Sequence, residues 1–136
     1  MYKHILIPVA FDHADSAENS IKVAQKLLAA DGRLSILHVM EEMPGYVSAY
    51  LPEGTMEANR ADASARLNAI AKNIGKNGTT AVVRGHANRT IVSYAEEHDA
   101  DCIVIASHKP GIEDYFLGST AAHVVRHAKC SVHVIR

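Results

Sequence analysis

Cysteine is scarce in this chain of 136 residues, which contains only Cys102 and Cys130. Their spacing matches no cysteine-based metal motif, so the sequence excludes a site of that kind. Both cysteines lie among apolar residues, and a reducing compartment keeps such residues as thiols. We therefore expect two buried thiols that pack in the core, with a redox-active pair as the alternative.

The sequence also lacks long apolar runs and an excess of one charge. No apolar stretch approaches the roughly 20 residues that a membrane-spanning helix requires. The formal net charge is −1, which gives no electrostatic basis for binding a nucleic acid. The opening MYKHILIPV leads directly into a strand and has none of the features of a signal peptide. We therefore expect a cytoplasmic protein without a nucleic-acid partner and without membrane association.

What is present is the composition of an ordinary globular domain, with 48% hydrophobic and 21% charged residues. A chain of 136 residues is long enough for one domain with a real core and too short for two. We therefore predict a single domain that covers residues 1–136.

Strand-like and helical segments alternate along the chain. Density in β-branched and other apolar residues predicts strands at residues 3–9, 34–40, 80–85, 101–107 and 131–136. Helical spacing of apolar residues predicts helices at residues 15–32, 56–73, 88–98 and 119–128. Gly32 is expected to end the first helix. Residues 41–54, with two prolines and two glycines, form the one long irregular stretch.

This alternation predicts the fold class. Helices of about ten or more residues between strands require parallel pairing with right-handed crossovers. We therefore predict an α/β fold with an open, doubly wound, Rossmann-like parallel sheet of five strands, order 3-2-1-4-5, and about four helices on its two faces. Ligands of such sheets bind beyond the carboxyl ends of the strands, where the strand order reverses. Three loops should meet there, at residues 8–12, 39–42 and 106–119.

Two familiar phosphate-binding motifs are absent, the P-loop G-x-x-x-x-G-K-[ST] and the dinucleotide fingerprint G-x-G-x-x-G. Gly118, Ser119 and Thr120 nevertheless begin a predicted helix after a long loop. The free N–H groups of a first helical turn suit an anion, and the Ser119 hydroxyl can donate to a phosphate. The alternative is that Ser119 is only the N-cap of the helix.

No catalytic group emerges from the sequence. The spacing supports no Ser-His-acid or Cys-His pairing, and no two carboxylates bracket the long loop. His123 and His127 are four residues apart on a predicted helix, as two ligands of one metal ion would be. However, no carboxylate or cysteine stands at ligand spacing beside them. We therefore predict a binding protein or a slow switch, without a resident metal and with an ordinary helix surface at these histidines.

The chain resembles the universal stress protein family in the segments ILIPVAFD, LHV and ASHKPGIEDYFLGSTAAHVVRHAKCSVHVIR. Many members bind ATP or AMP through the pattern G-x-x-G-x9-G-[ST], whose last pair corresponds to Gly118 and Ser119. Ala106 and Lys109 stand where the two earlier glycines are usual, and the spacer is one residue shorter. This variant is most similar to the bacterial F/G-type members, a branch in which nucleotide binding is known.

The resemblance implies a site for an adenine nucleotide, ATP or AMP, with or without Mg²⁺. It implies that the phosphates contact Gly118, Ser119 and Thr120, with help from His108 and Lys109. Asp12 would address the ribose or a metal ion. The base and its surroundings would be framed by Pro8, Val9, Ala10, Val39, Ile105, Ala106 and Ser107.

The resemblance also implies a homodimer, because in the family the C-terminal strand pairs about a twofold axis. The alternating pattern of residues 131–136 suits such an exposed edge. The implied role is that of a stress-response regulator with an unknown downstream protein partner. Two alternatives stay open: a nucleotide-free dimeric scaffold, which the departures at Ala10, Ala106 and Lys109 favour, and a slow ATPase or self-phosphorylating switch.

Overall fold

The computed structural model describes residues 1–11, 14–75, 77–107 and 117–136. In these residues five strands form one parallel sheet in the order β3-β2-β1-β4-β5, which confirms the predicted fold class and strand order. The strands are β1 (Tyr2–Pro8), β2 (Leu28–Met40), β3 (Gly78–Arg84), β4 (Cys102–Ala106) and β5 (Ser131–Ile135).

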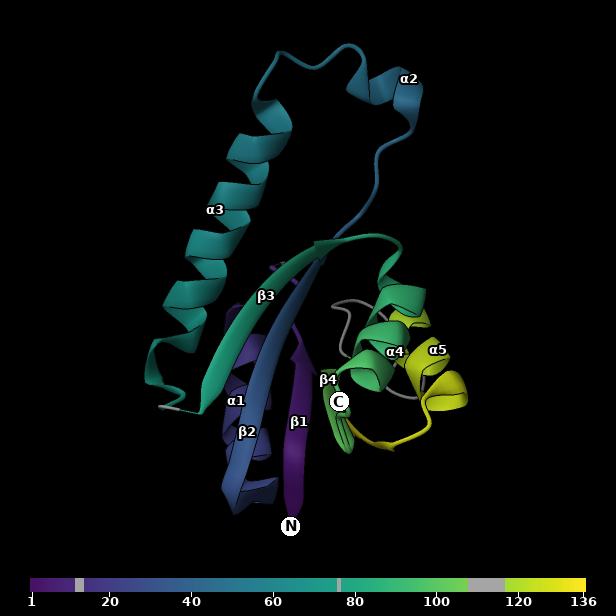
Figure 1. The fold of residues 1–136 in the computed structure, drawn as a ribbon. Coiled ribbons are helices and arrows are strands. Elements are labelled where there is room, and N and C mark those ends of the chain that lie inside the picture. The colour runs from purple at the N-terminus through teal and green to yellow at the C-terminus, as the bar shows by residue number, and fades with distance from the viewer. Residues whose placement is uncertain (12–13, 76, 108–116) are drawn as a thin grey trace.

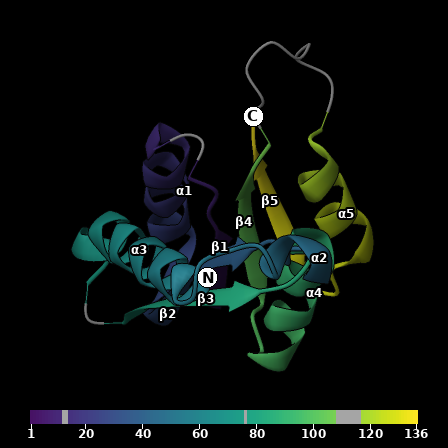
Figure 2. The ribbon, with the colours of Figure 1, turned by 90° about the horizontal axis from the view of Figure 1, so that it is seen from above.

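Helices cover both faces of the sheet, as Figures 1 and 2 show. One face carries α1 (Ala14–Leu27) and α3 (Thr55–Ile70), which continues into a 3₁₀ turn at Ala71–Asn73. The other face carries α4 (Ala87–Glu97) and α5 (Ser119–His127). None of the helices in the described residues has the length and apolar character that crossing a membrane requires.

The core has two layers because successive side chains of a strand point to opposite faces of the sheet. Ile5 and Ile7 pack toward α1 and α3, whereas Leu6 packs toward α4 and α5, and all three are 0% exposed. A strand covered on both faces has no solvent side, so its sequence shows no polar alternation. This is why β1 appears in the sequence as a continuous apolar run.

The first helix is shorter than predicted, because α1 ends at Leu27 and not at Gly32. Leu28 already pairs with Tyr2, and the register then shifts before His4 pairs with Arg33. Leu28 also packs against the core on the α1 side. The pairing of Leu28 with Tyr2 therefore ends the helix, and residues 29–32 form the irregular start of β2 before regular pairing resumes at Arg33.

The predicted irregular stretch 41–54 contains a short helix, α2 (Gly45–Ser48), which adds to the predicted four. The Pro44 carbonyl accepts hydrogen bonds from the N–H groups of Val47 and Ser48, at 2.9 and 3.1 Å. The Ser48 hydroxyl donates to the Gly45 carbonyl at 2.9 Å. Figure 1 shows that α2 lies beyond the carboxyl edge of the sheet, from where α3 runs back along one face.

His4 is a buried polar residue of β1, with 5% of its surface exposed. Its Nδ1–H donates to the His98 carbonyl at 2.8 Å, which leaves Nε2 to accept from the Ser35 hydroxyl at 2.7 Å. At the same end of the sheet the Asp101 carboxylate accepts from the backbone N–H groups of Lys3 and His4, at 2.9 and 3.0 Å. These contacts join the starts of β1 and β2 to the segment before β4.

We predict that protonation of His4 contributes to acid destabilisation. Burial lowers the pKa of His4, because desolvation disfavours the imidazolium. The unfolded chain therefore takes up this proton at a higher pH than the folded chain. The contribution of His4 to the free energy of unfolding is thus present above about pH 6.5 and is lost as the pH falls below it.

Urea unfolding between about pH 8 and about pH 5 tests this, with His4→Gln compared against the native chain. We expect the variant to be less stable at the higher pH and its unfolding free energy to decline less on acidification. Equal declines in the two proteins would contradict the role assigned to His4.

Candidate functional site

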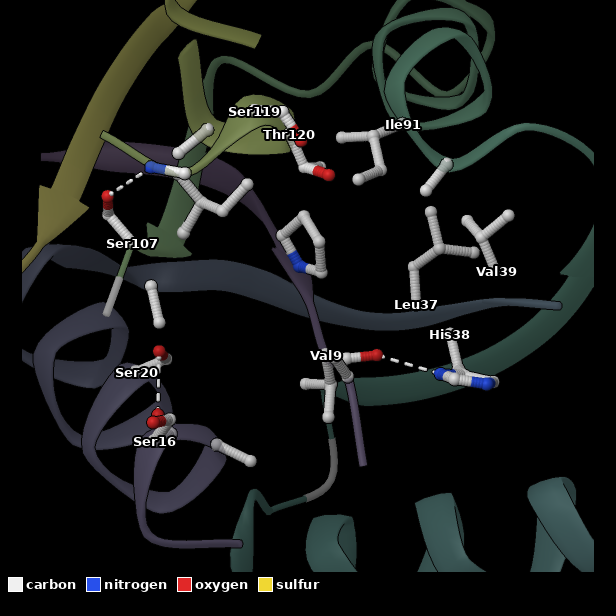
Figure 3. Close-up of a pocket in the computed structure, with 18 residues that line it drawn as sticks. Val9, Ser16, Ser20, Leu37, His38, Val39, Ile91, Ser107, Ser119 and Thr120 are labelled. Carbon is white, nitrogen blue, oxygen red and sulfur yellow. Dashed lines mark hydrogen bonds between the residues drawn. The ribbon is translucent and has the colours of Figure 1, made fainter. Parts of the chain in front are cut away.

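A cavity of about 250 Å³ opens at the carboxyl edge of the sheet. It lies among the ends of β1, β2 and β4 and the first turns of α4 and α5 (Figure 3). The strand order reverses at this place, since β1 lies between β2 and β4 and the helices that follow β1 and β4 cover opposite faces. The cavity therefore occupies the position where parallel α/β sheets bind ligands.

Most of the predicted site residues meet in this cavity. It is lined by Pro8, Val9, Ala10, Val39, Ile105, Ala106, Ser107, Gly118, Ser119 and Thr120. The other three, Asp12, His108 and Lys109, lie outside the described residues. The structure thus brings the described members of the set to one place, and their role in binding stays a prediction.

The cavity also has walls that the sequence reasoning missed. They come from α1, β2, α4 and α5 and consist of Ser16, Ala17, Ser20, Leu37, His38, Ala87, Ile91 and Ala121. Two signals were available: Leu37 shares a sheet face with Val39, and Ser16 and Ser20 are one helical turn apart. The contribution of α4 has no such local signal, because it depends on how that helix packs beside α5.

One half of the cavity is apolar. Val9, Leu37 and Ile91 are nearly fully buried, and Pro8 and Val39 lie beside them. The Val9 N–H donates to the Leu37 carbonyl at 2.8 Å, so the pairing of β1 with β2 continues to the cavity wall. Such a wall suits a flat apolar group.

His38 fixes the turn that follows β1. Its Nδ1–H donates to the Val9 carbonyl at 2.8 Å, a contact drawn in Figure 3. Its ring stacks on Phe11 with centroids 4.0 Å apart, and the Arg66 guanidinium lies 4.3 Å from the centroid of the Phe11 ring. Stacking and cation–π contacts of this kind hold the Val9–Phe11 backbone in one position against the cavity.

The other half of the cavity is formed by the start of α5. The Gly118 N–H donates to the Ser107 hydroxyl at 3.2 Å, and the Ser107 N–H donates to the Ile135 carbonyl at 2.8 Å. Gly118 is the N-cap and Ser119 is the first helical residue, so the alternative that Ser119 is only a cap is wrong. Because glycine has no side chain, no cap oxygen covers the first-turn N–H groups. These N–H groups belong to residues that line the cavity, and a helix start of this kind suits an anion.

The described lining carries no carboxylate, lysine or arginine, so apart from the His38 ring its polar groups are backbone dipoles and hydroxyl groups. Burial raises the pKa of the Cys102 thiol to about 11, which keeps it protonated and unreactive at neutral pH. Neither cysteine forms a disulfide; Cys102 is buried as predicted, whereas Cys130 is only partly buried, so the prediction of two buried thiols is wrong for Cys130. No group of three or more metal-ligating side chains occurs in residues 1–11, 14–75, 77–107 and 117–136. The arrangement can therefore bind a ligand with an apolar and an anionic part.

Comparisons with known proteins agree with this architecture. The model of the "Universal stress protein family" matches residues 1–136. Universal stress protein G of Salmonella typhimurium is 32% identical over 145 aligned residues, which cover 100% of both chains. The solved structure of the universal stress protein UspA from Lactobacillus plantarum is 29% identical with a TM-score of 0.73, and covers 99% of this chain and 98% of that chain.

The universal stress protein from Archaeoglobus fulgidus, solved in complex with dAMP, shares the fold. Its TM-score is 0.69 at 22% identity, over 99% of this chain and 98% of that chain. The family match, the full-length relative and the shared fold lead to one conclusion: this chain belongs to the universal stress protein family.

Proposed function

We propose that this chain is a cytoplasmic, homodimeric universal stress protein that binds an adenine nucleotide, AMP or ATP, and acts as a regulator of a stress response. The observation that carries the nucleotide proposal is the two-sided cavity, with an apolar wall opposite an uncapped helix start. A nucleotide needs both, because its base is flat and largely apolar whereas its phosphates are anionic.

The base is proposed to lie against Pro8, Val9 and Val39. The His38 contact holds the Val9 backbone, so this wall is formed before a ligand arrives. Ala10 and Ala106 bring only methyl groups to the cavity, which lets a base or ribose approach the backbone closely. A pre-formed wall favours affinity because binding does not have to order it.

The phosphates are proposed to lie at the start of α5. A Cβ added to Gly118 would meet no heavy atom closer than the Ser107 carbonyl oxygen, at 3.7 Å. The glycine therefore leaves room for a ligand at this position. We propose that Mg²⁺ enters with the phosphates of the nucleotide, since the described lining has no carboxylate. Asp12, which lies outside the described residues, keeps its predicted role toward the ribose or the ion.

The dAMP complex of the Archaeoglobus fulgidus protein supports this proposal, because there an adenine nucleotide is bound by a protein of the same fold. Titration calorimetry of the nucleotide-stripped chain tests it, with AMP, ATP and adenosine as ligands and GMP as the control. We expect one adenine-nucleotide site per chain with a Kd of about 1–100 μM, and weaker binding of GMP. No heat with any adenine ligand up to about 1 mM would favour the nucleotide-free scaffold instead.

The dimer is proposed to form through β5, which lies at one edge of the sheet. The Ile135 carbonyl points to β4, because it accepts from the Ser107 N–H. Backbone groups of alternate residues point to the same side of a strand, so those of Val132 and Val134 face outward. In the described part of the chain no strand pairs with this outer side, which leaves it available to a second copy.

Val134→Pro should convert the dimer into a monomer, because proline removes an outward N–H without removing a bond to β4. Val134→Ala keeps that N–H and is the matched control. Sedimentation velocity at micromolar concentration measures the result. A Val134→Pro protein that stays as dimeric as the alanine control would contradict pairing through β5.

A further inference from the structure

His123 lies on α5, one helical turn beyond residues that line the proposed phosphate end of the cavity. It follows Thr120 by three residues and Ser119 by four on α5, so the three side chains share one face of the helix. Ser119 and Thr120 line the cavity, and Figure 3 shows them across from Ile91 of α4. A phosphate at the start of α5 would therefore have the His123 ring one helical turn away.

The groups that act electrostatically on His123 in the described residues are basic side chains. Two of them lie at the start of α4: His86 is the N-cap of this helix, and Arg89 is in its first turn. Arg126 and His127 act on His123 from its own helix, and the His127 ring lies 4.3 Å from the His123 ring. Desolvation lowers the pKa of His123, and these four neighbours lower it further.

The Glu41 carboxylate lies at the start of α4. Glu41 accepts a hydrogen bond from the Ala87 N–H at 3.2 Å and so occupies the beginning of α4. The start of α5 has no cap side chain. An anion between the two helices is therefore directed toward α5 and His123 rather than toward α4.

We propose that His123, supported by His86 and Arg89, is a specificity-determining residue of the nucleotide site that makes phosphate binding tighten as the pH falls. The inference rests on the proposed function. A bound phosphate favours the imidazolium of His123, so binding takes up a proton. The gain in affinity is complete below the pKa of His123 in the free protein, and it disappears above the higher pKa that the phosphate induces. The affinity for adenosine, which has no phosphate, does not increase as the pH falls.

Titration calorimetry with AMP and adenosine at about pH 6 and about pH 8 tests this, in the native chain and in His123→Asn. The phosphate of AMP itself loses charge near pH 6, so the comparison is between proteins at each pH. We expect the native chain to gain about three- to tenfold more affinity for AMP on acidification than His123→Asn does. Repeating the titration in buffers of different ionisation enthalpy should show greater proton uptake in the native chain. His98→Asn, an exposed histidine at the far end of α4, should behave like the native chain.

An equal pH response of AMP binding in the native chain and His123→Asn would overturn the proposal. So would a pH response of adenosine binding as large as that of AMP. If His123→Asn fails to fold, Arg89→Gln provides the test, because it should weaken AMP binding at both pH values and leave adenosine binding unchanged. If the native chain binds neither ligand, the proposed function itself fails; if both bind without a role for His123, only this inference fails.

Discussion

Replacement of Gly118 by valine should weaken AMP and ATP binding by at least about tenfold and leave the fold intact. The Gly118 backbone has φ −59° and ψ 153°, a conformation open to any residue, and an added Cβ has space. The two valine methyl groups would stand in the cavity above the uncapped N–H groups of α5, where the phosphate is proposed to bind. The variant should lose about 1 kcal/mol of stability or less, as expected for a change at an N-cap.

Gly45→Val is the matched control, because Gly45 is exposed in α2 and an added Cβ would meet no atom within 4 Å. For both variants, calorimetry with AMP measures the binding affinity and thermal unfolding measures the stability. Normal AMP affinity in a folded Gly118→Val protein would place the phosphate elsewhere. Any slow Mg²⁺-dependent release of phosphate from ATP should disappear in the same variant, and turnover that survives would have to come from another site.

Leu67→Ala should cost about 2–5 kcal/mol in the free energy of unfolding, the range for large-to-small changes in a core. Leu67 is 0% exposed, and only it and Ala63 are buried in the described side chains of α3. Leu67 packs with Ile5, Ile7 and Ile36 in the same core layer. Its truncation therefore leaves a cavity in the core layer beneath α3.

Chemical denaturation of Leu67→Ala and of Asn59→Ala measures this cost. Asn59 is exposed on the same helix, and alanine has the higher helix propensity, so its replacement should be neutral or slightly stabilising. A cost below about 1 kcal/mol for Leu67→Ala would mean that α3 contributes little to the cooperative fold.

The strand order and the place of the cavity were predictable because they follow from strong local signals. Doubly buried strands such as β1 are dense in apolar residues, and parallel pairing with long crossovers leaves few topologies. The carboxyl edge at the reversal of strand order then follows from topology alone. The position of Gly118, Ser119 and Thr120 at the start of α5 was predictable because a helix start after a long loop is visible in the sequence.

Features that depend on tertiary contacts were not predictable. Nothing local shows that Leu28 pairs with Tyr2, so the end of α1 was placed too late. The stack of His38 on Phe11 joins the turn after β1 to β2, and the walls from α4 depend on packing beside α5. In each case the residues can be read from the sequence, but their contact depends on how the chain folds.

A crystal structure of the chain grown with AMP tests the central claim most directly. We expect electron density for the base against Val9 and Val39, and density for the phosphate at the N–H groups of Ser119 and Thr120. A nucleotide bound elsewhere, or an empty cavity at a saturating AMP concentration, would contradict the proposed site.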